Sequence, residues 1–313
     1  MERQMRRTHI LTALLGATAL TLTACGGGVS TPDSEVKAEA NSATKSEAKS
    51  DANSATKSGK TTTVSIDDVL AHPRRAEEAK RDKFRNPKGT NEFFGIGPGK
   101  RVGELWPGWY TNVNAPYLAA NDGQFVAILY ASGVSEGLDK RIAGYKEKYS
   151  DTAVYGEIEY GSFWQDSGSI LSDDQEKLDI LVTYRNVHNW MGRDYAQDAF
   201  DRFYDALKPG GILGVVEHRL PETAVQDPKG GTGYVQESYM KDLAKQAGFE
   251  FVASSEVNAN PLDSADHPFG VWTLQPRSRT PKEGSEEAKD FNADAYFNIG
   301  ESDRATLKFR KPQ

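Results

Sequence analysis

The chain of 313 residues has a single cysteine, Cys25, and therefore no second thiol with which to pair. This excludes an internal disulfide framework and a cluster of thiolate metal ligands. Positive charge is not in excess either, because the net charge is -7, and this argues against a nucleic-acid backbone as a partner. Beyond the first 25 residues, the sequence has no apolar run long enough to span a bilayer.

The segment that ends at Cys25 has the features of an export signal. Three arginines precede an apolar stretch over residues 10–22, which is shorter than the ~20 residues that cross a bilayer core. The stretch ends in Leu22-Thr-Ala-Cys25, which resembles the bacterial lipobox. We therefore predict a signal peptide and lipobox over residues 1–25, with a lipid anchor on Cys25 that holds the protein to a membrane. An ordinary signal peptide with an incidental cysteine is the alternative.

The residue after the cysteine is Gly26 and not an aspartate, which resembles lipoproteins that are sent to the outer membrane. We expect a cell-envelope lipoprotein in the outer membrane, facing the periplasm. Residues 26–63 are rich in Ala, Ser, Thr, Lys and Glu, and the heptad Ala40–Ser46 recurs as Ala52–Ser58. Such a composition cannot offset the entropy of ordering, so we expect a flexible tether. The folded domain then covers residues 64–313.

Apolar segments alternate with segments of helical periodicity along this domain. Strands are predicted over residues 101–106, 124–130, 152–158, 178–184, 212–216, 249–254 and 305–310. Helices are predicted over residues 66–84, 110–119, 138–148, 195–207 and 236–247. The alternation predicts an α/β fold with a parallel sheet and helices on both faces. Functional residues are expected just after the strands, at their carboxyl ends.

Eight short motifs follow one another in this domain. They are Phe93–Ile96, Glu104–Thr111, Tyr184–Trp190, Leu207–Leu213, Val216–Arg219, Glu256–Pro261, Gly270–Leu274 and Ile299–Arg304. Their order and number resemble a family of predicted bacterial methyltransferases that depend on S-adenosylmethionine and have the class I fold. The resemblance spans residues 66–312. It implies a Rossmann-like, seven-stranded, mostly parallel sheet, S-adenosylmethionine as the cofactor, and a small molecule or an envelope component as the methyl acceptor.

The resemblance also implies which residues contact the cofactor. They lie in the turn after the first strand and in the turn after the fourth, and they are Glu104, Pro107, Gly108, Tyr110, Arg185 and Asn186. The first of these turns departs from the family, because Trp106-Pro-Gly-Trp-Tyr110 is about two glycines shorter than the usual form. We expect Trp109 to close the methionine end of the cofactor site. No carboxylate ends the second strand to bind a ribose, and Glu136 is the nearest acid.

Three residues after the fourth and fifth strands are predicted to be catalytic, namely His188, Glu217 and His218. A methyltransferase needs a base that accepts a proton from its nucleophile, and imidazole and carboxylate groups suit that role. With His267 they also form a candidate metal set, but no two of them have the close helical spacing of zinc motifs. We therefore predict no metal. The structural alternative is that the histidines are only hydrogen-bonded pairs.

Other polar and aromatic residues near the strand ends have two interpretations each. Polar residues over residues 256–267 follow the sixth strand and either join the site or satisfy the backbone of a turn. The segment Glu301–Arg304 is expected to form a local ion-pair and capping network, although Arg304 is also placed to reach a substrate anion. Tyr184, Trp190 and Trp272 either belong to the core, which we favour, or frame a pocket.

Two functions follow from the sequence. The first is a methyltransferase anchored as a lipoprotein. The second is a protein with the methyltransferase fold that has lost its cofactor turn and binds a ligand or a partner at the cell envelope. The short turn, the missing ribose carboxylate and the export signal favour the second function. The polar groups after the fourth, fifth and sixth strands favour the first, and this is the function that we predict, with the second as the alternative.

Overall fold

A computed structural model describes residues 63–313. The predicted signal peptide, its lipobox and nearly all of the predicted tether lie outside these described residues. None of the helices described is long and apolar enough to cross a bilayer.

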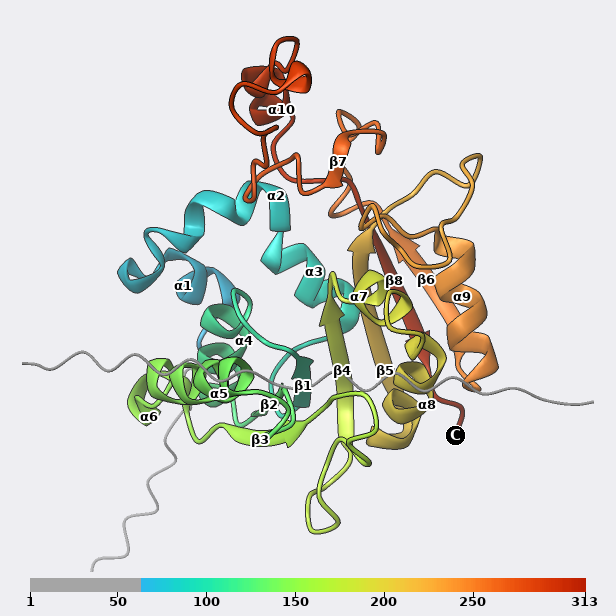
Figure 1. Ribbon diagram of the computed structural model, residues 1–313. Helices are drawn as coiled ribbons and strands as arrows, with labels where there is room; N and C mark the ends of the chain where they lie inside the picture. The colour runs from blue at the N-terminus through green and yellow to red at the C-terminus, as the bar shows by residue number, and fades with distance from the viewer. Residues whose placement is uncertain (1–62) are drawn as a thin grey trace, which may run out of the picture. The chain divides into compact units, whose positions relative to one another are not determined.

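Seven strands form one sheet in the order β3-β2-β1-β4-β5-β8-β6 (Figure 1). The strands are β1 (Arg101–Leu105), β2 (Gln124–Leu129), β3 (Glu159–Ser162), β4 (Leu178–Tyr184), β5 (Leu207–His218), β6 (Glu250–Ser255) and β8 (Arg304–Arg310). β1 to β5 pair in parallel, and β8 runs antiparallel to both of its neighbours. The predicted α/β fold with a seven-stranded, mostly parallel sheet is therefore confirmed.

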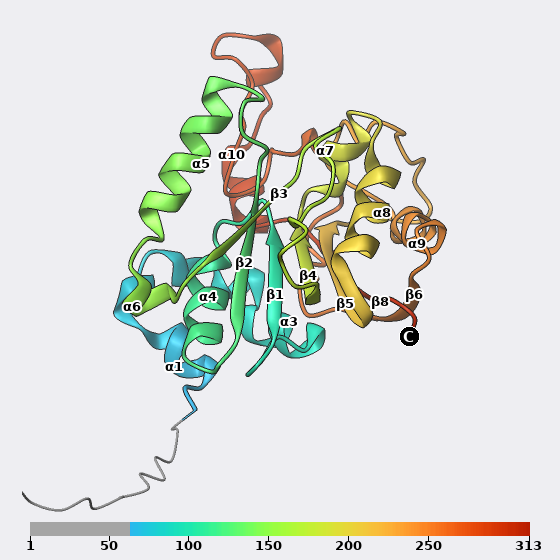
Figure 2. The ribbon, with the colours of Figure 1, turned by 90° about the horizontal axis from the view of Figure 1, so that it is seen from below.

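Most helices pack on the two faces of this sheet, and the last helix of the chain stands off its edge. The helices are α1 (Ile66–Ala71), α2 (Asp82–Arg85), α3 (Pro87–Phe94), α4 (Thr111–Ala119), α5 (Glu136–Lys148), α6 (Thr152–Tyr155), α7 (Val187–Met191), α8 (Ala196–Ala206), α9 (Glu237–Gln246) and α10 (Ala293–Ile299). Alternate strand residues feed two separate cores, because successive side chains point to opposite faces. Figure 2 shows α8 and α9 beside β5 and β8, with α4 to α6 beside β2 and β3.

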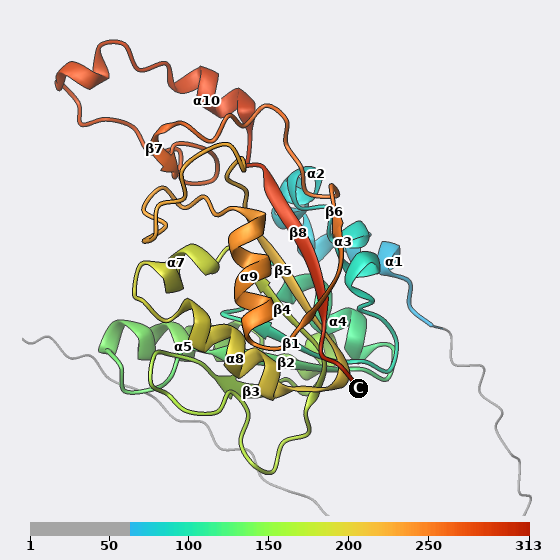
Figure 3. The same ribbon diagram turned by 90° about the vertical axis from the view of Figure 1, so that its right-hand side faces the viewer.

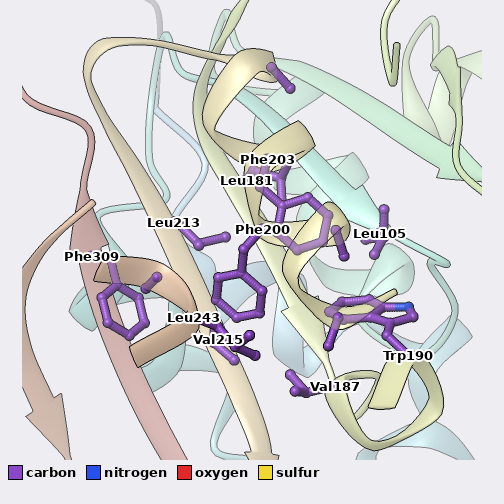
Figure 4. Packing of buried hydrophobic residues seen from close by; sticks show 14 of the residues in the cluster. Leu105, Leu181, Val187, Trp190, Phe200, Phe203, Leu213, Val215, Leu243 and Phe309 are labelled. Atoms are coloured by element: carbon purple, nitrogen blue, oxygen red, sulfur yellow. The ribbon is translucent and has the colours of Figure 1, made fainter. Parts of the chain in front are cut away.

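The larger core lies between the sheet and α7, α8 and α9. Trp190, Phe200 and Phe203 are fully buried there against Leu181 and Leu213 of the central strands (Figure 4). The apolar positions of α8 recur at the spacing of one helical face, which explains why this segment buries a single side. Trp190 thus belongs to the core, as we expected.

Two predicted elements were wrong. The helix expected over residues 66–84 stops at Ala71, because His72 is extended before Pro73, and short 3₁₀ turns (Pro73–Arg75 and Glu78–Arg81) lead to α2. The strand expected over residues 152–158 is the helix α6, which Asp151 caps and Gly156 ends with a positive φ of 68°. The strand β3 begins only at Glu159.

The carboxyl ends of β1, β2, β4 and β5 meet at one edge of the sheet. From this edge the segment between the short strand β7 (Pro268–Val271) and β8 projects outward, with a 3₁₀ turn at Glu286–Ala288 and the helix α10 (Figures 1 and 3). The residues that precede β8 therefore return to the same edge as the ends of β4 and β5.

Replacing Phe200 by alanine should lower the free energy of unfolding by about 3–5 kcal/mol, because the ring is fully buried in the larger core. Urea unfolding of residues 63–313 measures this change. Val225→Ala is the control, since Val225 is 93% exposed and should change the stability by less than about 0.5 kcal/mol. Equal effects of the two substitutions would contradict this packing.

Candidate functional site

Aromatic rings fill the edge of the sheet around the turn after β1. Trp106 has a positive φ of 45°, and its indole stacks on Tyr130 after β2 with 4.6 Å between ring centroids. Its Nε1 donates a 3.1 Å hydrogen bond to the carbonyl of Phe163 after β3. On the other side, Tyr110 stacks on Tyr184 of β4 with 3.8 Å between centroids. One pair of rings thus joins the ends of β1 and β2, and the other joins β1 to β4, next to the switch point where this kind of sheet binds ligands.

The polar residues predicted to contact the cofactor in this region bond to the chain itself. The carboxylate of Glu104 is buried and accepts hydrogen bonds from the Gly108 backbone N at 3.3 Å and the Asn114 Nδ2 at 3.5 Å. Asn186 Nδ2 donates to Thr183 Oγ1 at 3.1 Å. These groups stabilise the turn in its present form.

Two further side chains of the turn contact Arg85. Pro107 is partly exposed, and the Tyr110 hydroxyl donates to the carbonyl of Arg85 at 2.8 Å. The Arg85 guanidinium lies 4.9 Å from the centroid of the Trp109 ring. Trp109 therefore supports an arginine, and Trp106, not Trp109, occupies the space over the strand ends.

The end of β2 has Tyr130 where the fold commonly has a carboxylate for a ribose. Glu136 is exposed and pairs with Lys140 at 2.6 Å, and Asp139 accepts from the Gly133 backbone N. Within residues 63–313, the side chains at the ends of β1 and β2 therefore do not fit S-adenosylmethionine. Rings lie over these strand ends, and the polar groups of the turn are engaged within the chain. A hollow of about 560 Å³ stays open beside Tyr130, at the ends of β2 and β3.

The next part of the same edge has a different character. His188 lies in the first turn of α7, and Glu217 and His218 end β5. His188 Nδ1 lies 3.1 Å from Glu217 Oε1, and the two imidazole centroids are 5.6 Å apart. The structure thus brings together the three residues that the sequence predicts to be catalytic.

Glu217 holds this group in place. Its Oε2 accepts hydrogen bonds from the backbone N of Val187 at 2.6 Å and of His188 at 3.4 Å, and its Oε1 accepts from the His218 backbone N at 2.9 Å. When His188 donates its Nδ1–H to Glu217, its Nε2 keeps the free lone pair. Glu217 is fully buried and acts by orienting His188.

His218 is held by a serine from the segment before β8. Its Nδ1 lies 2.5 Å from Ser302 Oγ. Burial, followed by the nearby His188 and Arg304, lowers the pKa of His218 well below its ordinary value of 6.5. The imidazole is therefore neutral at pH 7 and offers a lone pair.

A pocket of about 230 Å³ opens in front of the two histidines. We call it the arginine pocket, because Arg85, Arg185, Arg277 and Arg304 line it together with His188, His218, Trp272, Gln275 and Glu301. The Trp272 ring centroid is 6.1 Å from that of His188. We had favoured the core for Trp272, and this prediction was wrong, because Trp272 lines the pocket.

One carboxylate serves three guanidinium groups at this pocket. Glu301 Oε1 lies 2.5 Å from Arg81 Nε, and Glu301 Oε2 accepts from Arg85 Nε at 3.2 Å and from Arg304 Nη2. Burial alone raises the pKa of Glu301, but Arg304, Arg85 and Arg81 outweigh it and hold this pKa at about 2. The predicted ion-pair network of this turn is thus present, and Arg304 also reaches the pocket.

Positive charge exceeds negative charge around Glu301. Arg85 and Arg304 are 3% and 2% exposed. Among the described residues, Arg85 Nη1, Arg185 Nη1 and Arg304 Nε are buried without a hydrogen-bond acceptor, as is Arg81 Nη2. Burial, followed by the neighbouring Arg185, lowers the pKa of Arg85 to about 9. The pocket therefore has a surplus of buried N–H donors and of positive charge.

The cluster of His188, Glu217 and His218 has ligand atoms within 4.8 Å of one another, close enough for a metal ion. Two observations favour an anion over a cation. Both oxygens of Glu217 already accept hydrogen bonds from its neighbours. The guanidinium of Arg304 also contributes to the low pKa of His218, and the same field repels a metal cation. His267 lies apart from the cluster, bonded to Asp263 at 2.7 Å.

The polar residues after β6 have structural roles. Glu256 pairs with Arg219 at 2.8 Å, and Asn258 Nδ2 donates to Thr306 Oγ1 at 3.0 Å. Asn260 Nδ2 donates to the carbonyl of Glu301 at 2.7 Å. These bonds tie the turn after β6 to the start of β8, and so they help to hold Glu301 in position.

Arg85 is the main site residue that the sequence does not reveal. It lies just past the predicted helix 66–84, and nothing in its neighbourhood marks it as a ligand-binding residue. Only the break at Pro73 and the return of the chain along α2 bring it to Arg185 and Arg304.

The sheet order and the single antiparallel strand define the class I methyltransferase fold. Solved structures with similar folds include the [4+2]-cyclase SpnF (18% identity, 73% of this chain and 80% of that chain, TM-score 0.45). A SAM-dependent methyltransferase from Aquifex aeolicus is another (15% identity, 62% of this chain and 94% of that chain, TM-score 0.40). A TehB-like SAM-dependent methyltransferase from Corynebacterium glutamicum is a third (12% identity, 75% of this chain and 97% of that chain, TM-score 0.39). No family model and no curated protein matches the chain.

The buried Glu104, which bonds to the turn after β1, makes the stability of the protein depend on pH. Burial raises the pKa of Glu104 from its ordinary value of 4.5 to about 7. Below about pH 4.5 Glu104 is protonated in both the folded and the unfolded state, and its full contribution to stability is present. As the pH rises from about 4.5 to about 7, only the unfolded state ionises, and the free energy of unfolding falls by roughly 3 kcal/mol in all. Glu104→Gln should remove this loss.

Urea unfolding at pH 5.5 and pH 8.5 tests this prediction. Glu136→Gln, the same substitution at an exposed position, should keep the pH dependence of the unsubstituted protein. If the Glu104→Gln protein loses as much stability between the two pH values as the control, Glu104 is not the buried group described here.

Proposed function

We propose that this protein binds a small anionic ligand in the arginine pocket and is not a methyltransferase in its present form. The surplus of buried guanidinium donors around Glu301 carries this proposal. A buried charge without a partner costs on the order of several kcal/mol, so three guanidinium groups that share one carboxylate are better stabilised with a second anion present.

The donors in the pocket also suit an anion in their geometry. Guanidinium groups are planar and bind the oxygens of carboxylates and phosphates through pairs of N–H bonds. The pocket of about 230 Å³ is smaller than the ~300–1,000 Å³ of typical ligand sites, so the group that it encloses is small. A carboxylate or a phosphate meets both requirements.

The two histidines place a proton acceptor beside this anion. His218 is neutral, and Glu217 orients His188 with one ring nitrogen free toward the pocket. We keep His188 as the candidate base for a ligand that carries an acidic proton next to its anionic group, with Glu217 and His218 as the residues that support it.

Methyl transfer remains the activity that the resemblance implies, and the fold is compatible with it. It requires that the stacked Trp106 and Tyr130 leave the strand ends and that Glu104 releases the backbone of Gly108. The arginine pocket requires no such rearrangement, and for this reason the geometry favours anion binding.

Calorimetric titration of residues 63–313 with inorganic phosphate and with acetate tests the proposal. We expect binding that weakens about 10- to 100-fold in Arg185→Gln, since a hydrogen bond to a charged group contributes about 1.5–3 kcal/mol. Arg193→Gln is the control, because it removes the same charge at an exposed position outside the pocket.

A parallel titration with S-adenosylmethionine separates the two functions. The proposal expects no heat with this compound at millimolar concentration. Micromolar binding of S-adenosylmethionine that Arg185→Gln leaves intact, together with no binding of either anion, would restore the methyltransferase interpretation.

We further propose that this binding takes place at the cell envelope, on a lipoprotein anchored to the outer membrane and facing the periplasm. The predicted lipobox before Cys25 supports this location. Cys25→Ala in the full chain should abolish labelling by radioactive palmitate and move the protein out of the membrane fraction. Ser30→Ala is the control. A substituted protein that still sediments with membranes would contradict the anchor.

A further inference from the structure

A second hollow adjoins the arginine pocket. Its volume is about 530 Å³, and Gln275 and Glu301 line both spaces. We call it the outer chamber. One wall comes from the chain around α2, and another comes from α10, which projects from the edge of the sheet in Figures 1 and 3.

Large apolar side chains line this chamber and are open to water. Leu262 and Phe297 are 65% and 60% exposed, and Phe84 and Ile299 lie in the same wall. A single exposed leucine needs no explanation, but two of the exposed large apolar residues of the described chain meet in one hollow beside a charged pocket.

The rim of the chamber is basic. Lys80, Arg81 and Lys83 line it, and the Lys83 ammonium lies 4.7 Å from the centroid of the Phe84 ring. The chamber thus combines cations with several apolar side chains, and it shares Gln275 and Glu301 with the arginine pocket. This arrangement suits a ligand with an anionic head and an apolar body.

We propose that the ligand is an amphiphilic anion, whose carboxylate or phosphate head binds in the arginine pocket and whose apolar chain lies against Phe84, Leu262 and Phe297 in the outer chamber. This inference rests on the proposed function, because the arginine pocket must bind the head group. The two spaces together fall within the size range of small-molecule sites. Covering Leu262 and Phe297 with a chain removes apolar surface from water, which provides affinity that a bare anion lacks.

Affinity along a series of monoalkyl phosphates tests the inference. Inorganic phosphate is compared by calorimetry with ethyl, butyl, hexyl and octyl phosphate, all below their micelle-forming concentrations. We expect the affinity to rise with chain length by up to about fourfold for each buried methylene.

Two variants test where the alkyl chain of the ligand lies. Leu262→Ser and Phe297→Ser should each reduce the gain from ethyl to octyl phosphate and leave the affinity for inorganic phosphate unchanged. Val225→Ser is the matched control, because Val225 is an exposed apolar residue that does not line the chamber, and it should keep the full gain. All three side chains are largely exposed, so the folded protein should tolerate these changes.

The outcomes separate this inference from the proposed function. If inorganic phosphate binds and longer alkyl chains do not raise the affinity, the inference of an amphiphilic ligand is wrong and the proposed anion site stands. If no member of the series binds, both proposals fail.

Vesicles of phosphatidylglycerol distinguish a membrane lipid from a free amphiphile. Co-sedimentation of residues 63–313 that octyl phosphate displaces assigns a lipid head group, and no co-sedimentation alongside binding of octyl phosphate assigns a soluble amphiphile.

Discussion

The carboxylate of Glu301 is the point on which the functional edge of this protein depends. It binds Arg81 and Arg85 from the beginning of the domain and Arg304 from its last strand. Arg304 also donates to the carbonyl of Phe84 at 3.0 Å. Segments more than 200 residues apart are thus joined by one buried network. Because one negative charge cannot balance three positive ones, the same network that orders this edge leaves it attractive to an anion.

The edge of the sheet is divided into two halves with opposite properties. Over β1 and β2, Trp106 and Tyr130 stack where the class I fold usually binds its cofactor. Over β4, β5 and β8, polar groups converge on an open pocket. A fold does not fix a function, and here the open polar pocket lies over the second half of the sheet. The short turn after β1 connects both halves, because it places Trp106 over the strand ends and Trp109 against Arg85.

Much of this arrangement follows from sequence patterns. The apolar segment at residues 178–184 predicted a buried central strand, and the polar residues after it were expected to meet those after β5, because parallel strands end at one edge. His188, Glu217 and His218 were found in this way. The antiparallel direction of β8 was not predicted by periodicity alone, which is the same for both directions.

Other features depend on tertiary contacts that no local pattern records. The helix over residues 66–84 was predicted from its periodicity, but Pro73 ended it, and the turns that follow carry Arg81 and Arg85 to Glu301. Arginines separated by some 220 positions from their carboxylate leave no spacing to recognise. The packing of Trp106 was also missed, because the sequence shows a short turn without showing which ring enters the crevice.

The most direct test of the account is to locate an anion in the protein. Crystals of residues 63–313 grown without phosphate or sulfate would be soaked in selenate, and the anomalous signal of selenium would be measured. The account predicts a peak among Arg85, Arg185 and Arg304. An arginine pocket without a peak, in crystals that instead bind S-adenosylmethionine beside Gly108, would contradict it.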